Sequence, residues 1–140
     1  MKQIIAAACG VWLTLTAPVQ AQGQSAVVVE LYTSQGCSSC PPADALLAGL
    51  TNDPRVIPLA LHVDYWDYLG WKDKFADPKF TARQKAYAHH ARDKMVYTPQ
   101  MVIGGQTRIV GSRVGELENA IRQAAAVAAD AAAAEAAAAE

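Results

Sequence analysis

The sequence predicts an α/β fold: a mixed central sheet flanked by helices, in the order strand, helix, strand, helix, strand, strand, helix. Three observations predict it. Short β-branched apolar runs alternate with helical segments, which is typical of parallel strands joined by crossover helices. The last two runs are separated by Gly104-Gly105, a hairpin signal that adds an antiparallel pair. The 140 residues suit one domain, and a hydrophobic content of 52% is enough for a core.

The first 21 residues are predicted to be a secretory signal peptide. Lys2 gives a positive start, residues 4–16 are apolar and uncharged, and residues 19–21 have the small-residue pattern of a cleavage site. The alternative is a buried N-terminal helix. Cleavage removes Cys9, so the mature chain keeps two cysteines in an oxidising compartment. We therefore expect a periplasmic or secreted protein without a stable membrane anchor, because no later apolar run is long enough to span a bilayer.

The rest of the chain divides into a domain at residues 22–123 and an alanine-rich tail at residues 124–140, helical or disordered. The formal net charge is −1. This balance lacks the basic excess typical of nucleic-acid-binding proteins, so nucleic acid is not an expected partner. No heptad pattern indicates an oligomeric state.

The first predicted strand, at residues 27–32, is a β-branched apolar run of the kind that is buried in a sheet. A polar turn at residues 33–36 follows it. Pro41 and Pro42 mark a helix start, because proline is tolerated in the first turn of a helix. The helix continues through residues 43–50 and ends at the turn signal of residues 52–54.

The later elements follow from the same kinds of signal. A second strand carries Pro58, which is tolerable near a sheet edge or at the start of a strand. The expected elements are this strand at 56–63, an aromatic loop at 64–77, a helix from 78 to about 92, strands at 101–103 and 107–110, and a helix from 116 onward.

A Cys-x-x-Cys pair, Cys37 and Cys40, lies between the first strand and the first helix. At a helix start, backbone N–H groups and the helix dipole stabilise a thiolate, which is the nucleophile in disulfide exchange. We assign Cys37 as the attacking thiol and Cys40 as the resolving thiol. A structural disulfide is the alternative. Half of a zinc site is a second alternative, although zinc ribbons need another such pair.

Two further positions are candidates for the same site. Thr98-Pro99 stands before the third strand, where thioredoxin-like folds place a cis-proline against the dithiol; X-Pro bonds are the ones that adopt the cis form. Thr98 would then offer backbone groups to a peptide. Glu30, seven residues before Cys37, is a candidate proton acceptor for Cys40. Strand residues alternate faces, so its orientation is open.

The segment at residues 32–40 resembles glutaredoxin active-site segments. A closer resemblance is to the secreted thioredoxin-like family known as domain of unknown function 1223. The matching blocks are at residues 29–44, 62–76, 83–87 and 97–103. This resemblance implies a thioredoxin fold and export, but no settled activity. Members of that family continue into a second, β-rich segment, whereas this chain ends in alanines.

The aromatic loop at residues 64–77 follows the second strand, at the sheet edge where open α/β folds carry their sites. Asp64, Tyr65, Trp66 and Trp71 are the candidate substrate-binding residues. The alternative is that the aromatic side chains pack the loop onto the core.

Three histidines, His62, His89 and His90, raise the alternative of a copper or zinc site with the two thiolates. His89 and His90 point about 100° apart on a helix, so both are not expected to reach one metal. The preferred hypothesis is an exported thiol–disulfide oxidoreductase that acts on protein or small-molecule thiols and disulfides without a cofactor. The alternatives are a non-catalytic module that binds metal or peptide, and a disulfide with a structural role only.

Overall fold

The structure is a computed structural model that describes residues 25–139. The predicted signal peptide, with Cys9, lies outside the described residues. The predicted order of strands and helices is confirmed, and a 3₁₀ turn inside the aromatic loop is an addition. The elements are β1 (Val27–Thr33), α1 (Pro41–Gly49), β2 (Val56–His62), η1 (Asp67–Leu69), α2 (Pro78–His90), β3 (Gln100–Ile103), β4 (Thr107–Val110) and α3 (Val114–Ala138).

The sheet is mixed, with four strands in the order β2-β1-β3-β4. β1 and β2 are parallel, and β1 pairs antiparallel with β3, which pairs antiparallel with β4. Gly104 and Gly105 both have positive φ angles, 58° and 71°, as the tight β3–β4 turn requires. Pro58 lies on β2, an outer strand of this sheet, where a missing N–H is tolerated.

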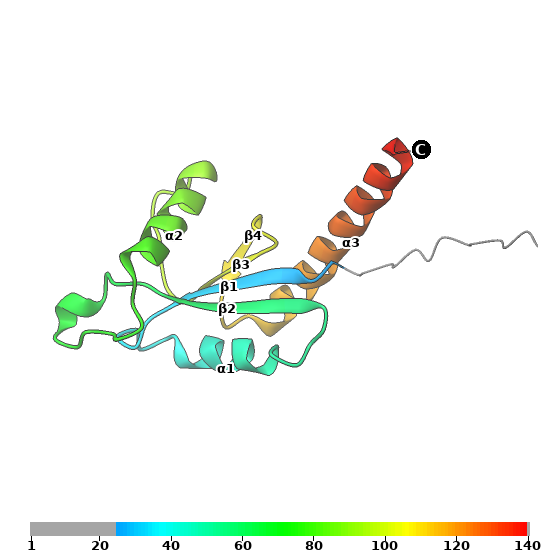
Figure 1. The fold of residues 1–140 in the computed structure, drawn as a ribbon. Coiled ribbons are helices and arrows are strands. Elements are labelled where there is room, and N and C mark those ends of the chain that lie inside the picture. Colours follow the sequence, from blue (N-terminus) through cyan, green and yellow to red (C-terminus); the bar gives the residue numbers. More distant parts are fainter. Residues whose placement is uncertain (1–24, 140) are drawn as a thin grey trace, which may run out of the picture.

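Helices cover both faces of the sheet (Figure 1). One core joins α1 and α3 to the sheet through Val29, Leu31, Leu47 and Ile121. A smaller core on the other face joins Tyr32 and Val102 to the aromatic loop and α2. Successive residues of β1 therefore alternate between the two cores, as strand geometry dictates.

Helix α3 continues to Ala138 and projects from the body of the molecule (Figure 1). Of the two alternatives for the alanine-rich tail, helical or disordered, the structure shows a helix as far as Ala138. Ala124 and Ala125 still pack partly against the core, and most of the following residues are exposed. Alanine has the highest helix propensity, so this extension needs few tertiary contacts to be helical. Within residues 25–139 no helix combines the length and hydropathy needed to cross a membrane.

Gly111, directly after β4, is a point of close packing between α1, β1 and the start of β3. A Cβ atom at this position would lie 3.0 Å from Cβ of Ala43, 3.1 Å from Cβ of Pro99 and 3.2 Å from Cδ1 of Leu31. The Gly111 amide also donates to the carbonyl of Pro99 at 3.0 Å. The absence of a side chain at Gly111 therefore lets three segments meet.

We expect Gly111→Ala to destabilise the protein by about 1–3 kcal/mol, because the added methyl group must displace packed atoms. Gly115→Ala is the matched control: it lies near the start of α3, and a Cβ there meets nothing within 4 Å. That change should be neutral or stabilising by up to about 1 kcal/mol. Urea unfolding measures both, and equal midpoints for the two variants would contradict the packing account.

Candidate functional site

Cys37 and Cys40 form a disulfide in the turn between β1 and α1, with their Cα atoms 5.4 Å apart. The turn is closed by the Cys37 amide, which donates to the Ser34 carbonyl, and by the Cys40 amide, which donates to the Cys37 carbonyl. Cys40 is the residue before the first turn of α1 and has no exposed surface, whereas Cys37 is 6% exposed. Cys37 is therefore the sulfur that a reactant can reach first.

The donors around Cys37 differ in part from the sequence-based expectation. Pro41 and Pro42 occupy the first two positions of α1 and carry no N–H, so the helix start offers fewer amides than a typical helix. Within the described residues, the amides of Ser38 and Ser39 have no protein acceptor. The Ser39 hydroxyl lies 3.6 Å from Cys37 Sγ. Stabilisation of a thiolate at Cys37 thus falls to the residues between the cysteines and to the helix dipole.

Trp66 connects the cysteine turn to Thr98. A Cβ on Gly36 would lie 3.1 Å from Cβ of Trp66, so the tryptophan backs onto the residue before Cys37. At its other end, the indole Nε1–H donates to Thr98 Oγ1 at 2.8 Å. The Thr98-Pro99 peptide bond is cis, as expected, and Pro99 is buried. The sequence-predicted residues Cys37, Trp66, Thr98 and Pro99 therefore gather at one edge of the sheet.

Tyr65 and Asp64 use their polar atoms to hold the aromatic loop on α2. The Tyr65 hydroxyl donates to Gln84 Oε1 at 3.1 Å, and burial raises the pKa of this tyrosine. Thr81 Oγ1 donates to the Asp64 carboxylate at 2.6 Å and accepts from the Asp64 amide. These contacts position the loop; a substrate contact by either residue stays a prediction.

Trp71 lies further out on the same loop. Its side chain is 64% exposed, and its indole N–H donates to Gln35 Oε1 at 3.0 Å. Gln35 is two residues before Cys37. Of the four candidate substrate-binding residues, Trp71 is the one that faces solvent.

Asp73 is a site residue that sequence reasoning missed. Its carboxylate accepts from the Gln35 amide at 2.8 Å and from the Phe75 amide at 2.9 Å, and His62 Nδ1 lies 2.6 Å from it. The side chain has no exposed surface. Burial opposes ionisation, but the bonds from Gln35, His62 and Phe75 outweigh it, and the pKa of Asp73 is lowered. Its position between Lys72 and Lys74 gave no signal of burial.

Glu30 lies on the face of the sheet that α2 covers. Its buried carboxylate accepts from the Tyr32 hydroxyl at 2.9 Å and from Arg83 Nε at 3.0 Å. The bond to Glu30 raises the pKa of Arg83, and burial followed by the Glu30 charge raises the pKa of Tyr32. The carboxylate is thereby engaged with α2, whereas α1 packs on the opposite face. Proton transfer from Cys40 to Glu30 stays a prediction.

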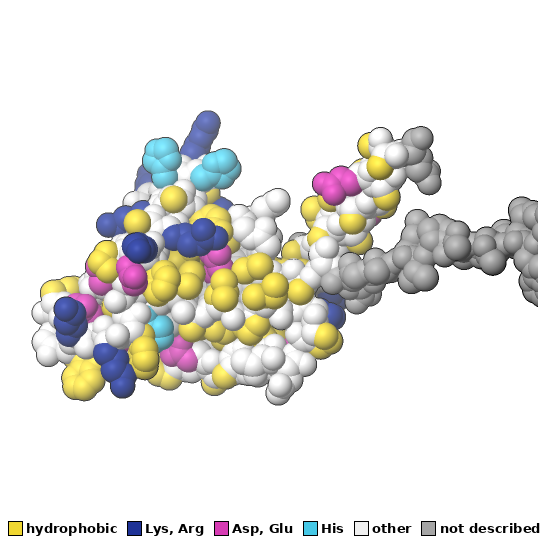
Figure 2. All heavy atoms as spheres, in the orientation of Figure 1, with side chains coloured by type: hydrophobic (Ala, Val, Ile, Leu, Met, Phe, Trp, Pro, Cys, Tyr) yellow, Lys and Arg dark blue, Asp and Glu magenta, His cyan; other side chains and the backbone are white. Residues whose placement is uncertain are grey.

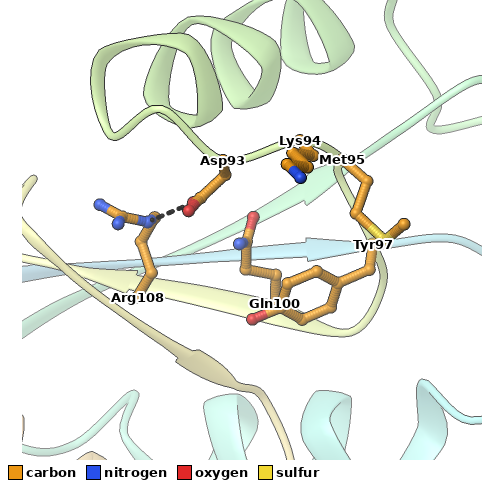
Figure 3. A pocket seen from close by; sticks show the side chains of 6 residues that line it. All are labelled: Asp93, Lys94, Met95, Tyr97, Gln100 and Arg108. Carbon is orange, nitrogen blue, oxygen red and sulfur yellow. Dashed lines mark hydrogen bonds and ion pairs between the residues drawn. The ribbon is translucent and has the colours of Figure 1, made fainter.

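A pocket of about 380 Å³ opens beside β3 and β4 on the α2 side (Figure 3). The sequence did not indicate it. Gln100 forms its buried floor and accepts from Gln84 Nε2 at 2.9 Å. Arg108 Nε donates to Asp93 at 3.0 Å across its rim. The lining residues are Asp93, Lys94, Met95, Tyr97, Gln100 and Arg108.

The histidines are dispersed over the molecule. His62 pairs with Asp73, while His89 and His90 are exposed at the end of α2. Residues 25–139 contain no group of three or more histidine, cysteine, aspartate or glutamate side chains arranged to hold a metal ion.

Comparison with known proteins places the chain in a family. The family model described as "Protein of unknown function (DUF1223)" matches residues 28–140. The chain belongs to this family. The crystal structure of protein AGR_C_4864 from Agrobacterium tumefaciens is similar, with 42% identity and a TM-score of 0.68. The match covers 74% of this DUF1223 chain and 46% of that protein, so this chain spans less than half of its length. No curated protein matches the chain.

In this DUF1223 chain, Asp73→Asn should destabilise the fold by about 1–3 kcal/mol, because buried donors lose a charged acceptor. Folding lowers the pKa of Asp73, so the ionised carboxylate stabilises the folded state. This stabilisation is fully present above the ordinary aspartate pKa of about 3.9, and it is lost as pH falls through the lower pKa of the folded protein. Urea unfolding from neutral to acidic pH should therefore show a smaller loss on acidification in Asp73→Asn than in the wild type.

Asp93→Asn is the matched control, since the Asp93 carboxylate is 41% exposed and pairs with Arg108 at the surface. Its effect should stay below about 1 kcal/mol. If the unfolding free energies of Asp73→Asn and the wild type change in parallel with pH, ionised Asp73 does not stabilise the fold in the way described.

Proposed function

We propose that this protein is an exported thiol–disulfide oxidoreductase with a thioredoxin-like fold, working in the periplasm or outside the cell. The observation that carries the proposal is the Cys37–Cys40 disulfide at the start of α1, at the same sheet edge as Trp66 and Thr98-Pro99. These are the two cysteines of the described residues, so each has the other as its partner.

The topology supports the thioredoxin-like assignment. A parallel β1–β2 pair joined through α1 is followed by an antiparallel β3–β4 hairpin, with helices on both faces. The dithiol follows β1 and the Thr98-Pro99 bond precedes β3, so both lie at the carboxyl edge of β1. Sites of open α/β sheets lie at this edge.

The proposed cycle starts from the reduced protein. The Cys37 thiolate attacks one sulfur of a substrate disulfide, forms a mixed disulfide and displaces the other substrate sulfur as a thiolate, which takes a proton. Cys40 then attacks Cys37 Sγ, and the Cys40 proton passes to the departing substrate thiolate. The internal disulfide forms and the second substrate thiol leaves. Two electrons and two protons pass to the substrate, and a dithiol acting on the oxidised protein runs the cycle in reverse.

Solvent exposure supports the proposed order of reaction, in which Cys37 attacks the substrate and Cys40 resolves the mixed disulfide. Cys37 is 6% exposed, whereas Cys40 is fully buried behind it. An external disulfide therefore meets Cys37 first, and Cys40 is held three residues away to resolve the intermediate.

The decisive measurements are the reduction potential of the pair and turnover with insulin or a scrambled disulfide protein. We expect a potential above about −300 mV and turnover that Cys37→Ser abolishes. Cys40→Ser should instead trap a mixed disulfide with the substrate, visible by mass spectrometry. A potential below about −300 mV, with wild-type turnover equal to that of Cys37→Ser, would assign the disulfide a structural role.

A second prediction concerns Ser39, whose hydroxyl contacts Cys37 Sγ. Loss of this donor in Ser39→Ala should raise the pKa of the reduced Cys37, because a hydrogen bond to the thiolate favours the charged form. Ser38→Ala is the control, since Ser38 is also exposed and has no side-chain hydrogen bond to the sulfur among the described atoms. The pH dependence of alkylation by iodoacetamide measures both values. Equal shifts in the two variants would exclude a specific role for the Ser39 hydroxyl.

A further inference from the structure

The outer part of the aromatic loop exposes a concentration of large apolar side chains. We call residues 68–75 the aromatic tip. It holds Tyr68, Leu69, Trp71 and Phe75, which are 78%, 56%, 64% and 55% exposed. Nine large hydrophobic side chains are exposed in the described part of the chain, and four of them lie within this tip. Such clustering is typical of surfaces that bind a protein or a membrane.

The aromatic tip is held in shape by hydrogen bonds. The Asp73 amide donates to Asp67 Oδ1 at 3.1 Å, and the Asp73 carboxylate accepts from the Phe75 amide. Gly70 ends η1 with a φ angle of 97°, which turns the chain back toward the body. Trp71 is fixed to Gln35 by its indole N–H. The apolar side chains therefore point outward from an ordered scaffold.

The outward charges of the aromatic tip are positive. Lys72 and Lys74 are exposed, and Lys74 Nζ lies 5.1 Å from the centre of the Phe75 ring. The carboxylate between them, that of Asp73, is buried and bonded inside. Figure 2 shows dark blue and yellow side chains together at the end of the molecule that carries η1. A partner of this surface must tolerate apolar insertion and provide negative charge.

The shape of the aromatic tip discriminates between partners. η1 and its flanking loop form the end of the molecule opposite the far end of α3 (Figure 1). A Cβ on Gly70 would meet no atom within 4 Å, so no other segment packs against this point of the aromatic tip. Extended peptides bind in grooves or along strand edges, which a protruding apex does not provide. A bilayer surface accepts a protruding apolar apex, and tyrosine and tryptophan favour its interfacial region.

We propose that the aromatic tip is a reversible contact site for anionic membrane surfaces. Tyr68, Leu69 and Trp71 enter the boundary between headgroups and acyl chains, and Lys72 and Lys74 meet the lipid phosphates. Because Trp71 is bonded to Gln35, two residues before Cys37, this contact turns the disulfide edge of the sheet toward the bilayer. The proposal does not depend on the redox function.

The test is co-sedimentation with vesicles of equimolar phosphatidylcholine and phosphatidylglycerol, compared with pure phosphatidylcholine. The full-length gene product is used, with its N-terminus determined by mass spectrometry so that all variants match. The wild type should bind the anionic vesicles and release them at high salt, since salt screens the lysine–phosphate attraction. Tryptophan fluorescence should be quenched by brominated lipid, because Trp71 is exposed on the aromatic tip.

Leu69→Ser should weaken anionic-vesicle binding about tenfold through lost apolar burial. Lys72→Glu should weaken it about tenfold or more at low salt. Val127→Ser and Lys94→Glu are matched controls, because they change an exposed apolar side chain and an exposed lysine away from the aromatic tip. Both should bind like the wild type. Unchanged thermal melting of Leu69→Ser shows that its loss of binding is not a loss of folding.

Three outcomes would overturn the proposal. The first is that the wild type does not bind anionic vesicles. The second is that the control variants lose binding as much as the variants in the aromatic tip do. In the third, the wild type binds reduced, carboxymethylated lactalbumin or dimerises, loses that association in Leu69→Ser, and does not bind vesicles. That result would assign the aromatic tip to a polypeptide or to a second copy of the chain. The redox assays of the preceding section are unaffected by any of these results.

Discussion

The buried carboxylate of Asp73 joins three segments on which the site depends. It binds the end of β2 through His62, the turn before Cys37 through the Gln35 amide, and its own loop through the Phe75 amide. Backbone donors in a buried setting need an acceptor, and an ionised carboxylate is a strong one. The aromatic loop and the cysteine turn are thus fixed against each other by one side chain.

At the edge of the sheet that carries the site, one face supports the helix after the cysteines and the other face supports the aromatic loop. On one face, α1 begins directly after Cys40 and packs through Ala43 against the region of Gly111 and Pro99. On the other, Glu30 and Arg83 join β1 to α2, which in turn receives the aromatic loop through Thr81 and Gln84. The alternation of side chains along β1 connects the two arrangements, because adjacent residues of one strand face opposite cores.

The fold was largely predictable from the sequence because its signals are local. The predicted boundaries agree with the observed ones to within a residue or two. They rest on the β-branched runs, on Pro41-Pro42 and on Gly104-Gly105. The hairpin also followed from local chemistry, and Pro58 lies on an outer strand, which is one of the two placements that its chemistry left open. The end of the last helix did not follow from the sequence, because an alanine-rich segment stays helical whether or not it packs.

The site was predictable only in part. The cysteine pair and Thr98-Pro99 have characteristic spacings, but these partners of Asp73, Gln84 and Arg83 are 11 to 53 residues distant in sequence. Such pairings depend on the register of the sheet and on the path of the loop. For the same reason, sequence alone could not separate Trp66, which is partly buried and bonded to Thr98, from Trp71, which is exposed.

The two prolines that follow Cys40 have a consequence for the proposed chemistry of the dithiol. They carry no N–H, so the residues between the cysteines and the helix dipole are left to stabilise a thiolate at Cys37. Substitutions of Ser38 and Ser39 in this chain would then act as a titration series. Each pair of side chains would set its own balance between thiolate and thiol on an unchanged scaffold.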